Sequence, residues 1–261
     1  MADELRALLD FAHQIAWQAG KLTLRYFQSE LTIDRKADES PVTIADREAE
    51  AYLRAKITAR YPDHAILGEE AGLSGNAGAT YRWVLDPIDG TKTFVRGVPL
   101  YGVMVGLLRE GQPVVGAVNM PALGEIVYGA QGHGCWWNGR PCQVSPMPSL
   151  ATSLVVATTA HGYERHGKAL AFQRLLAACG SFRTWGDCYG HLLVATGRAE
   201  VALDPIMNLW DAAALLPILE AAGGTFTDWH GVATIEAGEG LSSNGLVNEA
   251  LLACLNANAT T

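Results

Sequence analysis

The sequence has few cysteines and no pairing pattern among them. Its 261 residues include five cysteines, an odd number, and none belongs to a C-x-x-C pair. A disulfide framework or a cysteine-based zinc site is therefore not indicated, and we expect reduced thiols in a cytoplasmic protein. The motifs H-E-x-x-H, G-x-S-x-G and G-x-G-x-x-G are also missing. Their absence argues against a zinc hydrolase, a serine hydrolase and a dinucleotide-binding site.

Positive charge and long apolar runs are scarce as well. The chain has 19 lysines and arginines against 27 acidic residues, a net charge of −8, which argues against a nucleic acid partner. The longest apolar stretch, Val98 to Leu108, is shorter than the roughly 20 residues that cross a membrane. The acidic start, Met1 to Glu4, has no basic signal-peptide region. A small anionic substrate stays open, because a bound metal can reverse the local charge.

What the chain does have is apolar residues in a mixture of helix and strand patterns. Hydrophobic residues make up 49% of it, enough for a sizeable core in one large domain or two intimate lobes. Mixed helices and strands without a repeat predict a layered α/β or α+β architecture. The segment from Pro141 to Leu150, with two further prolines, is the candidate boundary between lobes of about 1–148 and 149–261.

Periodicity and turn residues assign the elements. Helices are predicted at 3–28, from the capping box at Thr43 to about Arg60, and at 167–178, 191–196, 209–222 and 247–255. Strands are predicted at 65–67, 83–85, 103–108, 114–118, 125–130, 135–137, 154–158, 181–185, 199–203 and 225–228. Residues 29–42 read as a loop or mobile hairpin, in which Lys36 could approach a phosphate.

The stretch from Trp83 to Phe94 is the centre of the chain. A short apolar strand runs into Asp86 and Asp89, with Pro87 between them and Gly90 after them. Such a turn can aim two carboxylates at one point, where they repel each other unless protonated or bridged by a cation such as magnesium. The start of a helix after Gly90 would add N–H groups that bind anions. The alternative is an ordinary surface turn, since Asp-Pro and Asp-Gly are common turn pairs.

Other acids follow predicted strands or begin predicted helices. Asp46 completes the capping box at Thr43, so it has a full structural explanation. Glu69 follows a strand, and Asp211 begins a helix. Taken alone, Glu69 is more often solvated and Asp211 more often structural, but the four acids Glu69, Asp86, Asp89 and Asp211 supply enough oxygen ligands for two or three magnesium ions.

With these motifs in order, the chain resembles the inositol monophosphatase family of magnesium-dependent phosphatases. The segments that carry the resemblance are Gly68-Glu69-Glu70, Asp86-Pro87-Ile88-Asp89-Gly90-Thr91 and Trp210-Asp211-x-Ala-Ala, followed by Glu220-Ala221-Ala222-Gly223-Gly224. Together they are specific, and the resemblance spans nearly the whole chain. It implies a layered αβαβα sandwich, a homodimer, and hydrolysis of a small phosphate monoester by a metal-activated water.

The resemblance also implies roles for individual residues. Glu69 and Asp86, with the Ile88 carbonyl, would bind one metal, and a third, weaker ion would use Glu69. Asp86, Asp89 and Asp211 would bind the second ion. Gly90 and Thr91 would hold the phosphate, and Asp46 would orient Thr91. The catalytic residues would therefore be Glu69, Thr91 and Asp46.

Within the family the sequence is most similar to the bacterial histidinol-phosphate phosphatase branch. The similarity lies in Lys92 with Phe94, Gly97-x-Pro99-Leu100-Tyr101-Gly102, Arg183 with Gly186-Asp187-Cys188-Tyr189-Gly190, and Phe226-Thr227-Asp228-Trp229. Asp187 and Asp204 could pair with the ammonium and imidazole groups of that substrate, and Arg183 is a further candidate contact. Asp204 distinguishes the two candidate substrates less well than Asp187, because acids can also bind the hydroxyls of an inositol ring.

Two alternatives stay open. In the first, the substrate is inositol 1-phosphate or another small sugar or nucleotide phosphate. In the second, the chain keeps the fold but is a non-enzymatic metal-binding or regulatory protein. All four ligand acids and Thr91 are present, which disfavours the second.

Overall fold

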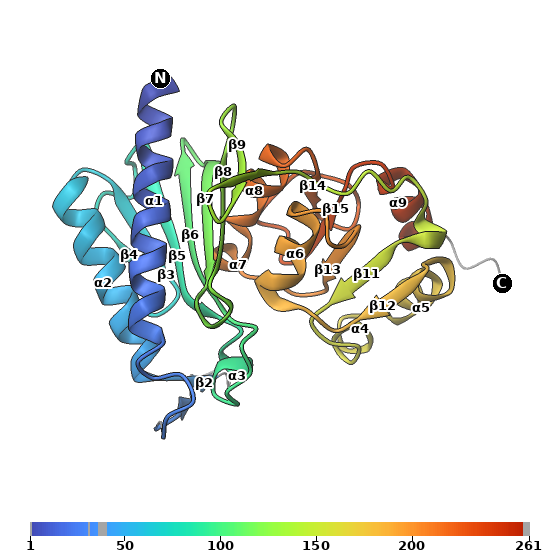
Figure 1. Ribbon diagram of the computed structural model, residues 1–261, viewed down its shortest axis with the longest axis horizontal. Helices are drawn as coiled ribbons and strands as arrows, with labels where there is room; N and C mark the ends of the chain where they lie inside the picture. The colour runs from blue at the N-terminus through green and yellow to red at the C-terminus, as the bar shows by residue number, and fades with distance from the viewer. Residues whose placement is uncertain (1, 31, 36–40, 258–261) are drawn as a thin grey trace.

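Two β-sheets stand side by side, with helices between them and on the outer face of each (Figure 1). The computed structural model describes residues 2–30, 32–35 and 41–257. Lys36 lies outside the described residues. On its two sides, β1 (Asp34–Arg35) and β2 (Pro41–Val42) pair antiparallel, so the predicted loop or hairpin at 29–42 contains a short hairpin.

The larger sheet has eight strands and carries the metal side of the site. Its spatial order is β10-β9-β8-β7-β6-β5-β3-β4. The strands are β3 (Ala65–Gly68), β4 (Gly72–Ser74), β5 (Tyr81–Asp89), β6 (Gly102–Arg109), β7 (Gln112–Met120), β8 (Glu125–Ala130), β9 (Gly134–Trp137) and β10 (Arg140–Cys142). Within it, β3 runs parallel to β5 and the other neighbours pair antiparallel. Because β3 and β5 are parallel, Gly68 at the end of β3 lies beside Leu85, at the same edge of the sheet as Asp86.

The smaller sheet has five strands in the order β12-β11-β13-β15-β14. They are β11 (Leu154–Ala157), β12 (Ser181–Arg183), β13 (Val201–Asp204), β14 (Thr225–Thr227) and β15 (Gly240–Ser243). β11 and β13 are parallel neighbours, so their carboxyl ends meet at one edge, where Asp204 ends β13.

The helices complete five layers. They are α1 (Ala2–Thr23), α2 (Ile44–Arg60), α3 (Thr91–Phe94), α4 (Gly162–Arg165), α5 (Ala169–Ala178), α6 (Asp187–Ala195), α7 (Leu209–Ala212), α8 (Leu215–Ala221) and α9 (Asn248–Asn256), with 3-10 turns at Pro121–Leu123 and Leu150–Thr152. Figure 1 shows α1 and α2 outside the larger sheet, α6 and α8 between the sheets, and α5 and α9 outside the smaller one. The predicted αβαβα sandwich is confirmed.

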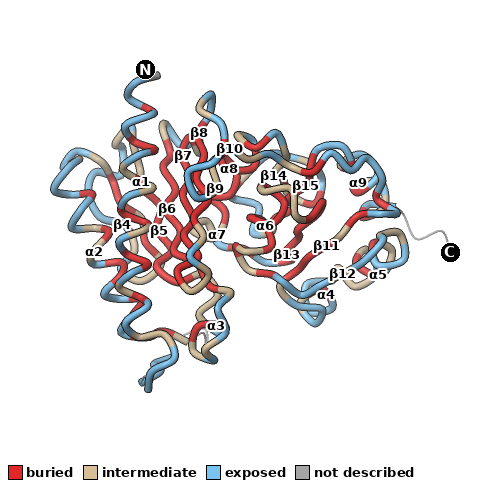
Figure 2. Tube along the Cα trace, in the orientation of Figure 1, coloured by how far each residue is buried: buried red, intermediate tan, exposed pale blue. Residues whose placement is uncertain are grey.

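Apolar side chains on both faces of each sheet explain this layering. In β5, Trp83 and Leu85 pack with α1 and α2, while Val84 points to the opposite face and packs with the helices between the sheets. Alternate strand residues face opposite sides of a sheet, and all of these are apolar because both sides are covered. Figure 2 shows the buried residues concentrated on the strands and on the helix faces that meet them.

The middle helices lie unusually close to the larger sheet. A Cβ atom added at Gly106 would lie 2.9 Å from the backbone of Ala213, and one at Gly116 would collide with the Ala214 carbonyl. Glycine at these two positions lets the α7–α8 segment rest directly on β6 and β7. Because Asp211 lies in α7, this contact fixes its distance from the acids of β5.

Some predicted boundaries were wrong. The first helix ends at Thr23, not residue 28, and turns with Gln28 in the left-handed region (φ 59°) follow. The predicted helix 209–222 is two helices, since Pro217 has no N–H to donate to the carbonyl of Ala213. The helix predicted from His191 begins earlier, at the first residue of α6.

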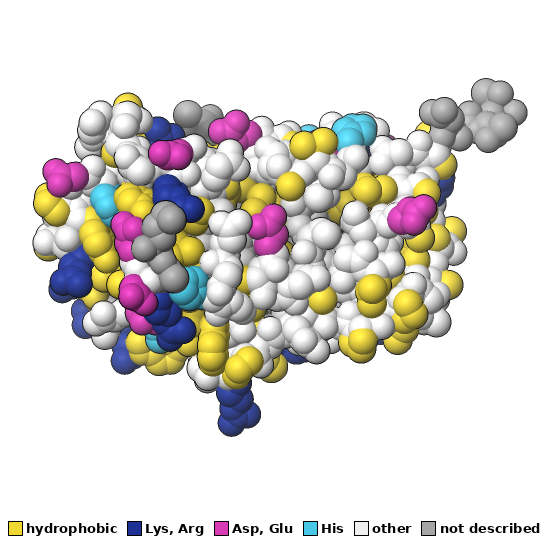
Figure 3. Space-filling model, turned by 90° about the horizontal axis from the view of Figure 1, so that it is seen from above, with side chains coloured by type: hydrophobic (Ala, Val, Ile, Leu, Met, Phe, Trp, Pro, Cys, Tyr) yellow, Lys and Arg dark blue, Asp and Glu magenta, His cyan; other side chains and the backbone are white. Residues whose placement is uncertain are grey.

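The surface mixes charges and apolar side chains. On the face seen from above, acidic and basic side chains are interspersed over the α1 and α2 end, whereas the smaller-sheet end shows mainly uncharged atoms (Figure 3). Within residues 2–30, 32–35 and 41–257, no helix is long and apolar enough to cross a bilayer.

Candidate metal and phosphate site

Asp86 and Asp89 lie at the carboxyl end of β5, where the pairing with β6 becomes irregular. The register shifts between these two residues, and Pro87, which has no N–H for the ladder, lies at the irregularity. The Ile88 amide donates a hydrogen bond to Oδ1 of Asp86 at 3.0 Å. Gly90 then takes a left-handed conformation (φ 82°) and begins α3. The turn therefore directs both carboxylates to the same side, as the sequence predicted.

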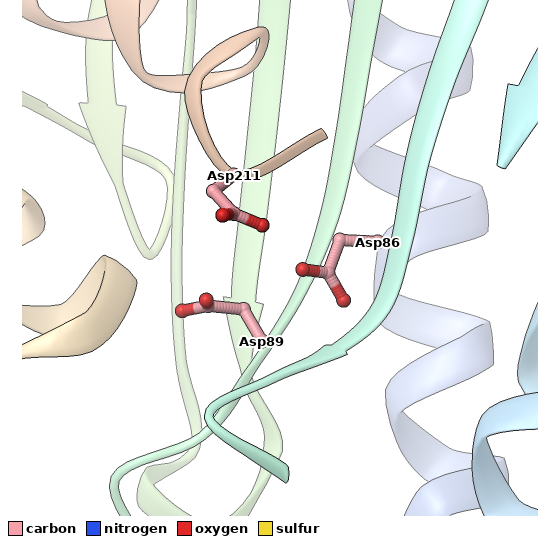
Figure 4. Close-up of side chains that lie close together, drawn as sticks. All are labelled: Asp86, Asp89 and Asp211. Atoms are coloured by element: carbon pink, nitrogen blue, oxygen red, sulfur yellow. The ribbon is translucent and has the colours of Figure 1, made fainter. Parts of the chain in front are cut away.

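Asp211 reaches the same place from the middle layer. It is the third residue of α7, and its Oδ2 accepts a hydrogen bond of 2.7 Å from the amide of Asn208, the residue that caps the helix. One carboxylate oxygen from each of Asp86, Asp89 and Asp211 lies within 4.8 Å of the others. Figure 4 shows the three side chains pointing into one shared space.

Burial and mutual repulsion act on all three acids. Burial raises the pKa of Asp86 well above its usual range, and the charges of Glu69, Asp89 and Asp211 raise it further. Burial, followed by the charges of Asp187 and Asp211, also raises the pKa of Asp89. For Asp211, burial raises the pKa to about 6. Clustered carboxylates that resist ionisation are stabilised by a cation, and the all-oxygen donor set fits magnesium.

Glu69 joins the cluster from the end of β3. Its amide donates to the carbonyl of Leu85 at 3.1 Å, continuing the parallel pairing with β5 by one residue. Its charge raises the pKa of Asp86 and of Asp211, beyond the effect of burial on both groups. The predicted strand-loop-strand path does bring Glu69 to the acids of the Asp-Pro-Ile-Asp turn.

Asp46 forms the capping box that its sequence position predicted. Its Oδ2 accepts from the amide of Thr43 at 2.8 Å and from its hydroxyl at 2.6 Å. Its other oxygen, Oδ1, is buried without a hydrogen-bond partner in the part of the chain that the structure describes. The Thr91 hydroxyl donates to the carbonyl of Ile88 at 3.0 Å. The expected contact between Asp46 and Thr91 is not among the hydrogen bonds of the described residues.

The opposite wall of the site carries two further acids. Asp187 begins α6 with a left-handed backbone (φ 50°). Its amide donates to the Thr158 hydroxyl at 2.7 Å, and its carboxylate accepts from Thr93 at 3.3 Å. Burial, followed by the charge of Asp204, raises the pKa of Asp187 to about 7. Asp204 accepts from Nε2 of His191 at 3.2 Å and from the amide of Thr158 at 3.3 Å.

A cavity joins the two walls. It has a volume of about 230 Å³, and its lining includes Asp89, Asp187, Asp204 and Asp211. A second cavity of about 730 Å³ adjoins it and shares Lys92 and Asp187 among its lining residues. The smaller cavity therefore has room for a small ligand that touches both the metal acids and the opposite wall.

The sequence did not reveal the hydrogen bonds that two residues, Cys188 and Thr158, make to the acids of this cavity. The amide of Cys188 donates to Oδ2 of Asp89 at 2.6 Å, and Thr158 bonds to both Asp187 and Asp204. Thr158 ends a predicted strand beside the strand of Asp204, and that parallel pairing is a signal that could have identified it.

Arg183 differs from the other predicted site residues. It lies in β12, an edge strand, with an exposed side chain, and its Nη1 donates to the neighbouring carbonyl of Phe182 at 2.7 Å. It lines neither of the two cavities at the acidic cluster. Its side chain is exposed, and its predicted contact with the substrate stays a prediction.

Comparison with known proteins finds relatives over nearly the whole chain. The inositol monophosphatase family profile matches residues 4–260. A histidinol-phosphatase of Chlorobaculum parvum is 46% identical over 251 residues, 95% of this chain and 96% of that protein. A histidinol-phosphatase of Mycobacterium tuberculosis is 37% identical, covering 95% and 98%. The structure of an inositol monophosphatase from Zymomonas mobilis matches with a TM-score of 0.84 at 32% identity, covering 97% and 98%.

Proposed function

Because the chain belongs to the inositol monophosphatase family, we propose that it is a magnesium-dependent phosphatase that hydrolyses L-histidinol phosphate to L-histidinol and phosphate. The observation that carries the chemistry is the group of Asp86, Asp89 and Asp211, whose oxygens lie within 4.8 Å of one another. Two or three magnesium ions per site would balance this negative charge. When bound, they would lower the pKa of a coordinated water and would offset negative charge on the leaving oxygen.

The proposed metal ligands come from the larger sheet and from the helices between the sheets. Asp86 and Asp89, with the Ile88 carbonyl, act from the end of β5, and Asp211 acts from α7. Glu69 adds a carboxylate from the end of β3, supported by the bond of its amide to Leu85, the residue before Asp86. The Cys188 amide holds Asp89 in place through the 2.6 Å bond to its Oδ2.

The phosphate-binding residues follow directly along the chain. We assign the amides of Gly90 and Thr91, with the Thr91 hydroxyl, to the phosphate, supported by the left-handed turn that begins α3 there. Asp46 is assigned to orient Thr91. The support is its buried Oδ1, which has no partner among the described residues and can still accept a hydrogen bond.

The alcohol part of the substrate faces the opposite wall. Histidinol carries an ammonium group, and Asp187 offers a carboxylate in the cavity that Asp89 and Asp211 also line. Asp204 is a weaker candidate, because His191 and Thr158 already donate to it. The named histidinol-phosphatases at 46% and 37% identity support this substrate. A role for Arg183 stays a prediction.

The likeness to an inositol monophosphatase at 32% identity favours inositol 1-phosphate as the second candidate. A phosphate-release assay with both substrates at several magnesium concentrations separates them. We expect a kcat/KM at least about tenfold higher for histidinol phosphate, which corresponds to ~1.4 kcal/mol. Equal rates, or faster inositol phosphate hydrolysis, would refute the substrate assignment. Absence of metal-dependent turnover with any phosphomonoester would favour a non-enzymatic protein.

The larger organisation is also proposed. We infer two lobes that meet between β10 and β11, supported by the two sheets, whose strands come from opposite sides of that link. The homodimer and the cytoplasmic location stay predictions. Light scattering of the purified protein tests the homodimer.

A further inference from the structure

A carboxylate outside the metal cluster is buried at the back of the Glu69 loop. Glu50 lies in α2 and is 1% exposed. Its Oε2 accepts from the amide of Glu70 at 2.8 Å, and its Oε1 accepts from the amide of Ala71 at 3.0 Å. The two residues that directly follow Glu69 are therefore tied to one buried side chain.

Arg54, one turn further along α2, extends this attachment. Its Nε donates to Oε1 of Glu50 at 2.7 Å, and its Nη1 donates to the hydroxyl of Ser74 at 2.8 Å. Its Nη2 donates to the carbonyl of Gly72. The Glu50–Arg54 pair thus holds the segment from Glu70 to Ser74 against the helix.

The residue before Glu69 also meets this pair. A Cβ atom added at Gly68 would collide with the Glu50 carboxylate, so the end of β3 passes directly over it. The amide of Glu69 itself is bonded to Leu85. The backbone on both sides of Glu69 is consequently fixed by β5 on one side and by Glu50 on the other.

This attachment opposes a repulsive force. Glu69 follows Gly68, which pairs with Leu85, the residue before Asp86, so the two acids carry like charges close together and repel when both are ionised. Without a restraint, the loop can relieve that repulsion by moving Glu69 away from the cluster. Charge-assisted hydrogen bonds to backbone amides are about twice as strong as neutral ones, so a buried carboxylate is well suited to resist this movement.

We propose that Glu50, supported by Arg54, is a positioning residue that holds Glu69 at the metal site. The proposal rests on the proposed function, in which Glu69 is a metal ligand. Glu50 acts through the backbone of the loop and contacts no substrate. Partners that orient metal ligands typically change metal affinity by 10–100-fold when they are lost.

The test is magnesium titration of the substrate-free protein by calorimetry. Glu50→Gln keeps the side-chain shape but turns one oxygen into an NH2 group, which cannot accept from the loop amides. We expect its magnesium dissociation constant to rise about tenfold or more. Hydrogen exchange at the amides of Glu70 and Ala71 should accelerate, while the thermal transition stays cooperative.

A matched control separates positioning from general stability. Glu125→Gln disrupts another partly buried pair, in which Arg198 donates to Glu125 at 2.8 Å, and neither residue lines the two cavities at the acidic cluster. We expect this variant to lower the melting temperature without changing magnesium affinity. If Glu50→Gln does not fold, Arg54→Gln is used, with the same expected rise in the dissociation constant.

The proposal and the proposed function fail in different ways. If Glu69→Gln weakens magnesium binding but Glu50→Gln and Arg54→Gln do not, the positioning role is wrong and the ligand assignment stands. If Glu69→Gln itself leaves magnesium binding unchanged, the ligand assignment falls, and the positioning role falls with it. In the Glu69→Gln background, Glu50→Gln should add less than twofold. Full additivity would show that Glu50 does not act through Glu69 and would overturn the proposal.

Discussion

Asp86 and Asp89 lie at the end of a single strand of the larger sheet, whereas Asp187 and Asp204 come from a helix and from a strand of the smaller sheet. The two walls also differ in how their acids are satisfied. Asp204 accepts hydrogen bonds from His191 and Thr158. On the metal wall, the nearest charged neighbours of Asp86 are all acidic, and they raise its pKa.

This difference separates two chemical tasks. The metal wall is a concentration of unbalanced negative charge that needs ions, so its function should disappear when one charge is removed. In the proposed function, the opposite wall faces the alcohol part of the substrate, so loss of one of its acids should change activity in degree and depend on the substrate. The following experiments test that contrast, in order of expected effect.

Asp89→Asn should abolish turnover. The change removes one negative charge from the cluster but keeps the shape and an oxygen that can accept from the Cys188 amide. Because a repulsive charge is lost, the melting temperature in chelator should stay the same or rise. Phosphate release and thermal unfolding measure the two effects. Wild-type rates at ordinary magnesium concentrations would contradict the metal assignment.

Thr91→Val should reduce kcat by about 10²–10³-fold, the ~2.7–4 kcal/mol lost when a positioned donor is removed from an oxyanion-type site. Thr91→Ser, which keeps the hydroxyl, serves as the control and should keep most of the rate. Steady-state kinetics at saturating magnesium measure both. An unchanged kcat in Thr91→Val would show that the Thr91 hydroxyl serves only its structural bond to the Ile88 carbonyl.

Asp187→Asn should raise KM for histidinol phosphate strongly, because a charged hydrogen bond of about 1.5–3 kcal/mol is lost. Hydrolysis of glycerol 2-phosphate, whose alcohol carries no charge, should change little. Comparing the two substrates checks the contrast between the walls. Equal losses for both would mean that Asp187 supports the whole site, and no change for either would place it outside the substrate's reach.

The smallest expected effect is a shift of stability with pH. Folding raises the pKa of Asp86, Asp89 and Asp211, to about 6 for Asp211. Groups with raised pKa stabilise the fold below their unfolded values of roughly 4 and lose that contribution as pH rises through the folded values. In chelator, the melting temperature should therefore fall by several degrees between pH 5 and pH 8.

Magnesium should reverse this trend, because it binds the ionised folded form. Its stabilising effect should be larger at pH 8 than at pH 5. Asp211→Asn is the comparison variant, and its pH dependence in chelator should be shallower than that of the wild type. Parallel curves for the two proteins would show that Asp211 is not among the groups responsible.

The sequence predicted the metal wall better than the opposite wall for a physical reason. Strand, proline and glycine signals around Asp86 and Asp89 act within a few residues, so spacing alone indicates how the two carboxylates lie. Asp211 could be placed by family resemblance, but its closeness depends on helix backbone resting on Gly106 and Gly116. No local pattern encodes that contact.

Other parts depended on tertiary contacts that the sequence does not display. The start of α6 at Asp187 involves a left-handed residue other than glycine, which propensity does not anticipate. Glu50 lies on an amphipathic helix, where an acid is usually taken for a solvated residue, yet the structure buries it under the Glu69 loop. The Arg183 expectation relied on neighbouring motif residues, and no local pattern indicated that this residue is exposed in an edge strand.

Two acids of the site also lie in the first turns of helices. Asp46 and Asp211 each occupy the third position of a capping box, bonded to the backbone of Thr43 and Asn208 respectively. These bonds satisfy N–H groups at the starts of the helices, a local contribution to stability that is separate from the repulsion among the acids. Selection for a folded, abundant protein therefore preserves both carboxylates even where activity is not under selection. A descendant of this chain that lost its catalytic function would tend to retain these two acids and to lose Asp89 first.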